Sequence, residues 1–317
     1  MKHQLSLAPE QIPIVCIMGP TATGKTDAAA QLYENIDAEI ISVDSSLVYT
    51  GMDIGTAKPN AEFLQNYPHH LVDIRHPNES YSVADFFKDS SILIKNITAR
   101  GKMPIFAGGT MFYFNSLEQG LTQLPKADDE LRAKITEEAG SIGWPALHKR
   151  LQALDPQSAA RIDAMDAQRI QRALEIVLAE GKPVADHNQH RKLPAPNPLL
   201  KIALSFSDRS ILHERIGRRF DIMLDAGLEA EVRSLLADGV DAEAASMRMI
   251  GYRQMLEYIH GNIDADRLRE KGVVATRQLA KRQLTWLRNQ KNLVWWMDQG
   301  LENKEFQELV ALVKQFV

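Results

Sequence analysis

The chain has 317 residues, 44% of them hydrophobic and 25% charged, with a net charge of −4. These are the values of an ordinary globular protein with room for about two domains, or for one domain with a large insertion, and they exclude fibrous and wholly disordered chains. The negative net charge excludes a globally basic nucleic-acid-binding protein, so such a role would have to rest on local clusters of charge.

The sequence shows no sign of a membrane segment or of export. No apolar run approaches the ~18 residues that a membrane-spanning helix needs, and residues 1–10 lack the pattern of a signal peptide. The single cysteine, Cys16, excludes a disulfide within the chain and lies in an apolar run, where a buried thiol is expected. We therefore expect a cytoplasmic protein without membrane contact.

Short apolar segments rich in Ile, Val and Phe predict strands of a sheet. The first four lie at residues 12–18, 39–43, 70–74 and 103–107. The stretches between them are long enough for helices, which predicts parallel α/β architecture. A fifth predicted strand, residues 200–206, resumes the sheet after a long helical region, and helical periodicity follows with a break at Gly227.

A helical insertion is predicted between the fourth and fifth strands. No convincing strand pattern occurs there, whereas helix signals recur, such as Asp166 opening a helix that Gly181 closes. We expect a helical insertion domain at residues 125–198 and a P-loop NTPase-like core, a parallel sheet flanked by helices, at residues 1–124 and 199–317.

The strongest motif follows the first predicted strand and opens a helix. It is the sequence Gly19, Pro20, Thr21, Ala22, Thr23, Gly24, Lys25 and Thr26, which matches G-x-x-x-x-G-K-[ST]. In such a phosphate-binding loop the backbone amides wrap a phosphate, Lys25 neutralises its charge and the Thr26 hydroxyl can bind Mg²⁺. The alternative is a glycine-rich turn without a ligand.

The sequence has no clear match to the pair of acidic residues that a nucleotide hydrolase typically carries. Such an enzyme carries a strand ending in a Mg²⁺-binding Asp, often followed by a second acid. Asp44 and Asp73 end apolar runs, but Ser45 and Ile74 follow them. Transfer of a group from a diphosphate therefore competes well with hydrolysis.

Residues just after the predicted strands are expected to face the bound phosphate. Asp44 could act as a general base or bind Mg²⁺, or could simply cap a turn. After the fourth strand, Gly108 and Gly109 would allow close backbone approach and place the Thr110 hydroxyl at a reaction centre, unless they form a plain tight turn. Arg219, on a helix after the fifth strand, could reach a diphosphate or lie on the surface.

A cluster of basic residues lies on a predicted helix near the C-terminus. Over residues 273–291 there is no acidic residue. Helical geometry places Arg277, Lys281, Arg288 and Lys291 within one third of the circumference, and Leu279, Trp286 and Leu287 opposite them. The pattern favours a helix whose apolar side packs in the core and whose basic side binds a nucleic-acid backbone. The alternative is that the basic side is simply a charged face in solvent.

Taken together, these motifs resemble the tRNA dimethylallyltransferases, also called tRNA isopentenyltransferases, over about residues 13–296. The matching segments are the phosphate-binding loop, residues 44–59, the Gly-Gly-Thr after the fourth strand, and residues 166–175, 251–254 and 276–288. Ala107 and Ile250 stand where that family usually has Val, and both replacements stay apolar.

The resemblance implies transfer of the dimethylallyl group from dimethylallyl diphosphate to N6 of adenosine 37, in tRNAs that read codons starting with U. It implies Asp44 as the general base, Thr110 at the reaction centre, and Lys25, Thr26, Arg219 and Mg²⁺ on the diphosphate. It also implies that the anticodon stem-loop is bound by a monomer. The implied tRNA contacts are Asp44, Ser45, Ser46, Leu47, Thr110, Arg132, Gln168, Arg169, Ile170, Gln171, Arg172, Arg248, Met249, Ile250, Gly251, Tyr252, Arg253, Lys281, Arg282, Gln283, Leu284, Thr285, Trp286, Leu287 and Arg288.

Three other functions share part of this pattern. A P-loop kinase of a small metabolite would share the loop and the sheet but leave the basic helix unexplained. A nucleotide-switched RNA-binding protein would keep the basic helix but would not need Asp44 and Thr110. A prenyltransferase acting on free adenine nucleotides would need neither the insertion nor the basic helix.

Overall fold

A computed structural model describes residues 12–122, 124–184, 191–192, 197–297 and 304–314. The chain forms two compact units. The larger unit combines Met1–Glu118 with Ala195–Val317, and the smaller unit is Gln119–Pro194.

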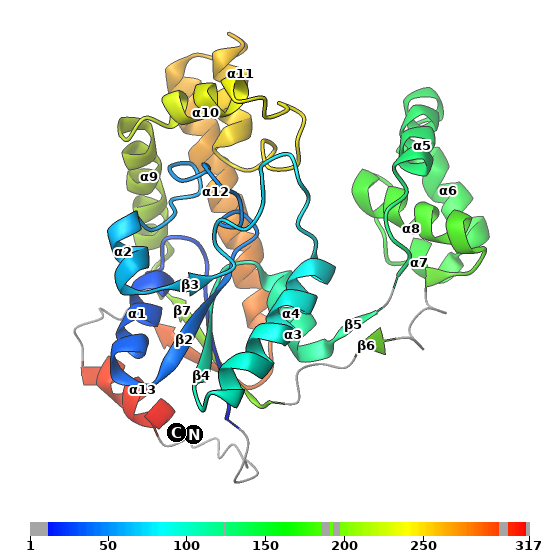
Figure 1. The fold of residues 1–317 in the computed structure, drawn as a ribbon. Coiled ribbons are helices and arrows are strands. Elements are labelled where there is room, and N and C mark those ends of the chain that lie inside the picture. The colour runs from blue at the N-terminus through cyan, green and yellow to red at the C-terminus, as the bar shows by residue number, and fades with distance from the viewer. Residues whose placement is uncertain (1–11, 123, 185–190, 193–196, 298–303, 315–317) are drawn as a thin grey trace. The chain divides into compact units, whose positions relative to one another are not determined.

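The larger unit is built on a parallel sheet of six strands in the order β3-β2-β4-β1-β7-β8. The strands are β1 (Ile14–Met18), β2 (Ala38–Val43), β3 (His69–His70), β4 (Met103–Gly108), β7 (Leu199–Ser205) and β8 (Leu293–Met297). Because all of them run in the same direction, the carboxyl ends of β1, β2 and β4 meet at one edge of the sheet (Figure 1). The predicted parallel α/β class is confirmed.

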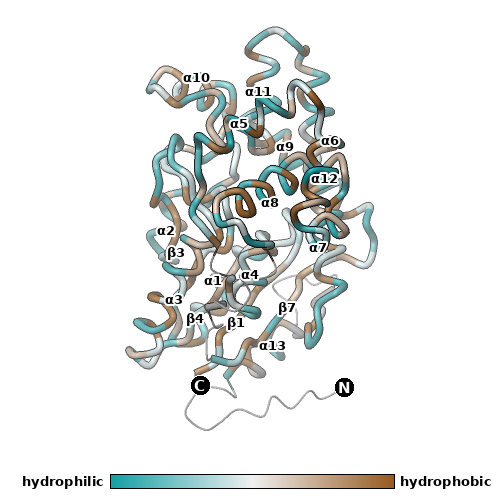
Figure 2. Tube along the Cα trace, turned by 90° about the vertical axis from the view of Figure 1, so that its right-hand side faces the viewer, coloured by the Kyte–Doolittle hydropathy of each residue, from teal (hydrophilic) through white to brown (hydrophobic). Residues whose placement is uncertain are grey.

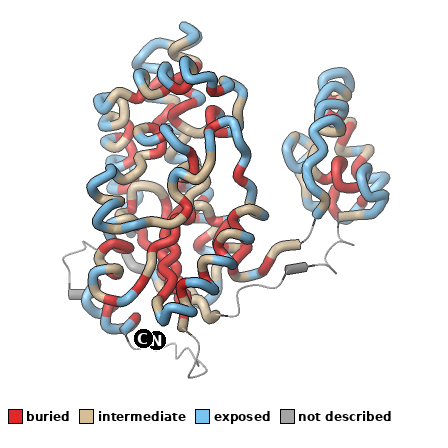
Figure 3. The backbone as a smooth tube through the Cα atoms, viewed as in Figure 1, coloured by how far each residue is buried: buried red, intermediate tan, exposed pale blue. Residues whose placement is uncertain are grey.

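Helices cover both faces of this sheet. The helices of the larger unit are α1 (Lys25–Asn35), α2 (Ala61–Asn66), α3 (Val83–Ala99), α4 (Met111–Gln119), α9 (Arg209–Asp225), α10 (Leu228–Ala237), α11 (Tyr252–Ile259), α12 (Ala265–Arg288) and α13 (Lys304–Lys314), of which α10 and α11 lie beyond the carboxyl ends of the strands (Figure 1). Alternate strand residues belong to two separate cores: Val15 and Ile40 pack with α1 and α13, whereas Cys16 and Ile41 pack with α3, α4, α9 and α12. Figure 3 shows the buried strands between these helices.

Three elements of the larger unit differ from the expectation. The strand expected at residues 70–74 is only the two-residue β3, because Leu71 and Asp73 have φ angles of 64° and 54°, outside the range of a strand. Strand β8 and helix α13 were not predicted. The break at Gly227 is confirmed, since α9 ends before it and α10 begins after it.

The smaller unit is helical, as expected, and has its own core. Its helices are α5 (Asp129–Ile142), α6 (Trp144–Leu154), α7 (Pro156–Ala159) and α8 (Ala167–Glu180), with a core that includes Ile135, Leu147, Leu151 and Leu174. Asp166 caps α8 and Gly181 ends it. Figure 2 shows that α8 has an apolar side and a polar side.

The bounds of this unit lie a few residues before the expected 125–198. The reason is a short antiparallel pair of strands, β5 (Leu121–Thr122) and β6 (Arg191–Lys192), which holds the two connecting segments together. Sequence patterns of two residues are too short to predict such strands.

The expectations about membranes and the cysteine can be compared with the structure. In the described part of the chain, no helix is both long and apolar enough to cross a membrane. Cys16 lies fully buried in β1, and burial raises the pKa of its thiol well above the ordinary value. The predicted buried thiol is therefore confirmed.

The crossing of α9 and α12 gives a test of the packing. A methyl group at Gly272 would lie 2.0 Å from the buried Phe220 ring, so Gly272→Ala should lower the free energy of unfolding by about 1–3 kcal/mol. Gly217 faces the same crossing, but its nearest neighbour would be 3.9 Å away. Gly217→Ala should therefore leave stability unchanged or raise it by about 0.5–1 kcal/mol. Urea denaturation measures both, and equal effects would contradict the packing described.

Candidate active site

The loop between β1 and α1 closes on itself around the Pro20 carbonyl. The Thr23 hydroxyl donates to that oxygen at 2.9 Å and the Lys25 ammonium donates to it at 2.6 Å. Gly24, the residue before α1, has a left-handed backbone with φ 81°. The strand, loop and helix expected around this motif are all present, and the free backbone amides at the amino end of such a helix are suited to bind an anion.

This loop borders a cavity of about 600 Å³ at the carboxyl edge of the sheet. The whole lining comes from the larger unit. It includes residues of the phosphate-binding loop, the ends of β2 and β4, helices α9 and α12, and the turn before α11. Of the residues predicted to bind or react, the cavity brings together Thr21, Lys25, Thr26, Asp44, Ser45, Ser46, Leu47, Thr110, Arg219, Met249, Ile250, Gly251, Tyr252, Arg282, Gln283 and Trp286.

Asp44 lies directly after β2 with one oxygen held and the other free. Its Oδ1 accepts hydrogen bonds from the Ser46 amide at 2.9 Å and the Ser46 hydroxyl at 2.5 Å. Its Oδ2 makes no hydrogen bond with the described residues. Ser46 thus fixes the orientation of a carboxylate that keeps one oxygen available to accept a proton.

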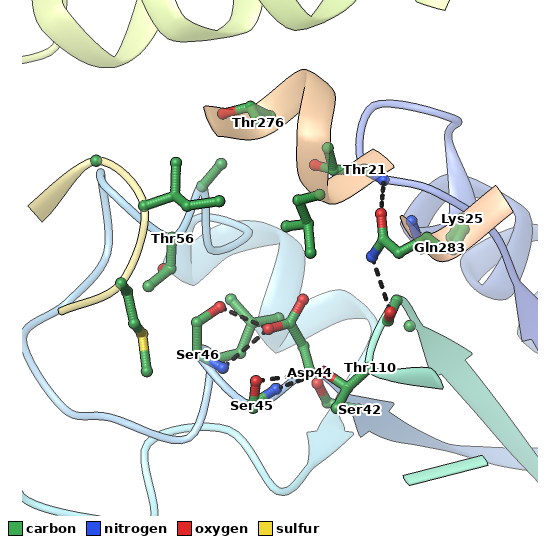
Figure 4. A pocket seen from close by; sticks show the side chains of 18 of the residues that line it. Thr21, Lys25, Ser42, Asp44, Ser45, Ser46, Thr56, Thr110, Thr276 and Gln283 are labelled. Carbon is green, nitrogen blue, oxygen red and sulfur yellow. Dashed lines mark hydrogen bonds between the residues drawn. The ribbon is translucent and has the colours of Figure 1, made fainter. Parts of the chain in front are cut away.

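Thr110 is tied to the same strand end. Its amide donates to the Val43 carbonyl at 3.0 Å, and its Oγ1 accepts from the Ser45 amide at 3.0 Å. Figure 4 shows Asp44, Ser45 and Thr110 grouped at the ends of two neighbouring strands. The two residues expected at a reaction centre therefore share one corner of the cavity.

Lys25 and Arg219 place two partly buried cations in the cavity. Burial, together with the nearby Arg219 cation, lowers the pKa of Lys25 to about 8, and the Asp44 carboxylate opposes both effects. Burial also lowers the pKa of Arg219, again opposed by Asp44. The only hydrogen bond given to Arg219 by the described residues runs to the Thr56 carbonyl at 3.3 Å. Two desolvated cations beside one carboxylate form a site for an anion of more than one charge.

Gln283 was expected as a tRNA contact, but the structure gives it an internal role. Its side chain is buried, with Oε1 accepting from the Thr21 amide at 3.2 Å and Nε2 donating to the Gly109 carbonyl at 2.8 Å. One amide group therefore joins α12 to both the phosphate-binding loop and the loop after β4 (Figure 4). Nothing in the sequence distinguishes Gln283 from the polar residues around it.

Glu231 is a residue of the site that sequence reasoning missed. Its carboxylate accepts from the amides of Asp53, Ile54 and Gly55, at 2.8, 2.6 and 3.0 Å, and from the Tyr252 hydroxyl at 2.7 Å. Gly55 and Tyr252 line the cavity, so the hydrogen bonds of Glu231 fix the position of two residues of the cavity wall. Its partners are far apart in sequence, and only the folded chain brings them together.

The faces of α12 differ in part from the expectation. Arg277, Lys281 and Arg288 are exposed as predicted, but Lys291 lies beyond the end of the helix. Leu279 and Trp286, expected in the core, line the cavity with Thr276 and Gln283, because these positions recur every three or four residues along one stripe. The core face consists of Val273, Ala280, Leu284 and Leu287.

Some residues implied as tRNA contacts have buried side chains. Leu284 and Leu287 pack in the core of the larger unit, and Ile170 packs in the core of the smaller one. Their side chains support the helices rather than forming a surface. Thr285, Arg248 and Arg253 are exposed and lie outside the cavity lining.

In the smaller unit, two of the implied contacts converge on one buried acid. Glu175 is 1% exposed and pairs with Arg132 Nε at 3.1 Å and Arg172 NH1 at 3.0 Å. Gln171 donates to the Thr136 hydroxyl at 2.7 Å, while Gln168 and Arg169 are exposed near the start of α8. Pairing with the buried Glu175 carboxylate therefore holds both guanidinium groups in fixed positions.

The parallel sheet and the closed loop before α1, with two partly buried cations beside it, are the features of an α/β protein of the P-loop type. A family model described as IPP transferase matches residues 47–290. The chain belongs to this family.

Relatives and solved structures agree with this assignment. A tRNA dimethylallyltransferase from Methylobacillus flagellatus is 54% identical over 281 residues, covering 88% of this chain and 89% of the relative. One from Aromatoleum aromaticum is 56% identical over 274 residues, covering 86% of each. The crystal structure of a tRNA isopentenylpyrophosphate transferase from Bacillus halodurans is 36% identical, covers 96% of this chain and 97% of its own, and has a TM-score of 0.71. A eukaryotic dimethylallyltransferase, described as acting on tRNA, is 26% identical, covers 96% of this chain and 79% of its own, and has a TM-score of 0.79.

The lowered pKa of Lys25 predicts how diphosphate binding depends on pH. The protonated Lys25 amine binds an anion, and a bound anion raises the pKa of that amine again. At a pH above about 8, the pKa of Lys25 in the protein without ligand, binding must therefore take up a proton. Affinity for inorganic diphosphate should therefore fall as the pH rises above about 8. Calorimetry at that pH, in two buffers of different ionisation enthalpy, measures the uptake. The same uptake in Lys25→Arg, whose guanidinium stays protonated, would contradict this origin.

Proposed function

We propose that this chain transfers the dimethylallyl group of dimethylallyl diphosphate to N6 of adenosine 37 in the anticodon loop of tRNA, releasing diphosphate. The names of its relatives support the reaction class and the RNA substrate. The observation that carries the proposal is a single cavity that holds both a site for a diphosphate and an oriented carboxylate.

The diphosphate is proposed to lie between the phosphate-binding loop, Lys25 and Arg219. As the bond between C1 of the prenyl group and the diphosphate oxygen breaks, negative charge collects on the departing oxygens. Cations and amides already in position stabilise that charge without having to reorganise. Ile216, Phe220 and Leu279 give the same cavity an apolar side, suited to a hydrocarbon group.

Mg²⁺ fits this site through the Thr26 hydroxyl, which lines the cavity beside Lys25. In the described residues no group of three or more His, Cys, Asp or Glu side chains could hold a metal. A cation bound by few protein ligands, by diphosphate oxygens and by water matches the usual coordination of Mg²⁺. When bound, it would add positive charge at the leaving group.

Asp44 is proposed as the general base for the acceptor. The N6 amine of adenine attacks C1, the new C–N bond replaces the C–O bond, and the proton lost from nitrogen passes to the free Oδ2 of Asp44. Thr110, fixed by Val43 and Ser45, would position the reacting groups. The adenine must leave its stack to enter the cavity, which costs less in an anticodon loop than in a duplex.

The tRNA is proposed to contact exposed basic side chains, among them Arg277, Lys281 and Arg288 of α12 and Arg169 of α8. Phosphate contacts of this kind position an RNA without reading its bases. We propose further that the protein acts as a monomer in the cytoplasm, where its tRNA substrates are found.

A comparison of two donors tests the function. The purified protein is incubated with Mg²⁺, unmodified tRNA carrying A36, A37 and A38, and either labelled dimethylallyl diphosphate or γ-labelled ATP. We expect label in the tRNA from the first donor alone, and a rate lower by about 10²–10⁴-fold in Asp44→Asn with diphosphate binding retained. Transfer of label from ATP alone would make the protein a kinase. A fully active Asp44→Asn would exclude Asp44 as the base.

The salt dependence of tRNA binding tests the exposed face of α12. Replacing Arg277, Lys281 and Arg288 with Gln removes three exposed cations and should lower the slope of log K against log salt by about 2, with diphosphate affinity unchanged. Arg267, on the same helix but paired with Glu270, provides the control, since Arg267→Gln should leave the slope unchanged. Equal slopes for the triple variant and the wild type would rule out this face as an RNA contact.

A further inference from the structure

The cavity wall contains a buried hydroxyl that takes no part in the proposed reaction. Ser42 is 3% exposed and lines the cavity, yet its Oγ has no hydrogen-bond partner among the described residues. A buried polar group without a partner lowers stability, and native structures contain few of them. Those that persist at a binding site are candidates for contact with a ligand.

The position of Ser42 in β2 decides which part of the cavity it faces. Its neighbours Ile41 and Val43 belong to the core beside α3 and α4, whereas Ile40 belongs to the core beside α1. Since side chains alternate along a strand, Ser42 lies on the α1 face, opposite Ala107 of β4. Helix α1 packs against this face and begins at Lys25, and Thr26 in its first turn also lines the cavity.

The side chains on this wall carry oxygen atoms that can bind a cation. Thr26, Ser42 and Asp44 all line the cavity, and Ser42 precedes Asp44 by two residues at the end of β2 (Figure 4). The diphosphate would instead be attracted by nitrogen groups that carry positive charge, which are the ammonium of Lys25 and the guanidinium of Arg219. A carboxylate beside Ser42 disfavours a phosphate oxygen there and favours a cation, and hard divalent cations bind through oxygen.

We propose that Ser42 is a positioning residue for the divalent cation of the diphosphate site, with its hydroxyl accepting a hydrogen bond from a water molecule on the cation that Thr26 holds. This inference rests on the proposed function, because the cation arrives with the diphosphate. It assigns the unpartnered hydroxyl to Mg²⁺ and its water rather than to the anion or to the RNA. Mg²⁺ keeps several of its waters in proteins, and outer partners of this kind tune its affinity.

The test measures binding of inorganic diphosphate by calorimetry at a series of Mg²⁺ concentrations, together with thermal unfolding without ligand. Ser42→Ala should raise the Mg²⁺ concentration for half-maximal diphosphate binding by about 10-fold. Diphosphate affinity in the presence of EDTA should stay unchanged. The melting temperature of the free protein should be unchanged or higher, since the substitution removes a buried hydroxyl that has no partner.

Ser116 provides a matched control. It is 2% exposed, lies in α4 outside the cavity lining, and its hydroxyl donates to the Tyr113 carbonyl at 2.7 Å. Ser116→Ala should lower the melting temperature and leave the Mg²⁺ requirement at the wild-type value. Ser42→Cys, which keeps nearly the same volume but hydrogen-bonds weakly, should behave like Ser42→Ala.

The outcomes separate this inference from the function on which it rests. A wild-type Mg²⁺ requirement in both Ser42 variants would overturn the assignment to the cation. An equal loss of diphosphate affinity with Mg²⁺ and with EDTA would overturn it too, because the hydroxyl would then bind phosphate. A wild-type protein that binds no diphosphate would instead contradict the proposed function.

Discussion

The cavity depends on how closely backbone segments approach one another where β1, β2 and β4 end. A Cβ atom at Gly108 would lie 2.1 Å from the Val43 carbonyl, and one at Gly109 would lie 2.5 Å from the Gln283 amide nitrogen. The absence of side chains there lets the loop after β4 lie against β2, so that Thr110 bonds to Val43 and Ser45. It also lets Gln283 reach Gly109 while holding Thr21. Larger residues would separate the diphosphate site from Asp44.

This close packing determines the electrostatics of the site. Lys25 and Arg219 are partly buried near each other, and neither is neutralised by a direct ion pair among the described residues. The free site therefore keeps two desolvated cations whose mutual repulsion a polyanion relieves. The Asp44 carboxylate opposes the lowering of the pKa of both cations, and Ser46 holds it through one oxygen. Its other oxygen remains available to the acceptor, so the anion and the proton acceptor occupy different parts of one cavity.

Much of this arrangement could be predicted from the sequence, because it depends on local patterns. The motif at residues 19–26 and the apolar runs before it, before Asp44 and before Gly108 predicted which strand ends meet, since parallel strands end at a common edge. Arg219 followed from its place on the helix after the fifth strand. The periodicity of α12 predicted its exposed cations but assigned Leu279 and Trp286 to the core, because an apolar wall of a cavity and a core face have the same pattern.

The remaining features depend on contacts between distant segments. Gln283 lies 262 residues from Thr21, and Glu231 lies 178 residues from Asp53. No local pattern distinguishes these polar side chains from their exposed neighbours. Ser42 is similar, because a serine in an apolar strand gives no sign that its hydroxyl lacks a partner. Strand β8 was missed because its five residues follow a basic helix without a distinct turn signal.

The central claim is that one cavity holds the donor diphosphate and delivers its prenyl group to one base. The most direct measurement is a single turnover of the protein, preloaded with dimethylallyl diphosphate and Mg²⁺, on an anticodon stem-loop, followed by nuclease digestion and mass spectrometry of the fragments. We predict one dimethylallyl group on N6 of adenosine 37 for each diphosphate released, and no product when guanosine replaces that base. Diphosphate release without RNA modification, or a prenyl group on another base, would contradict the account.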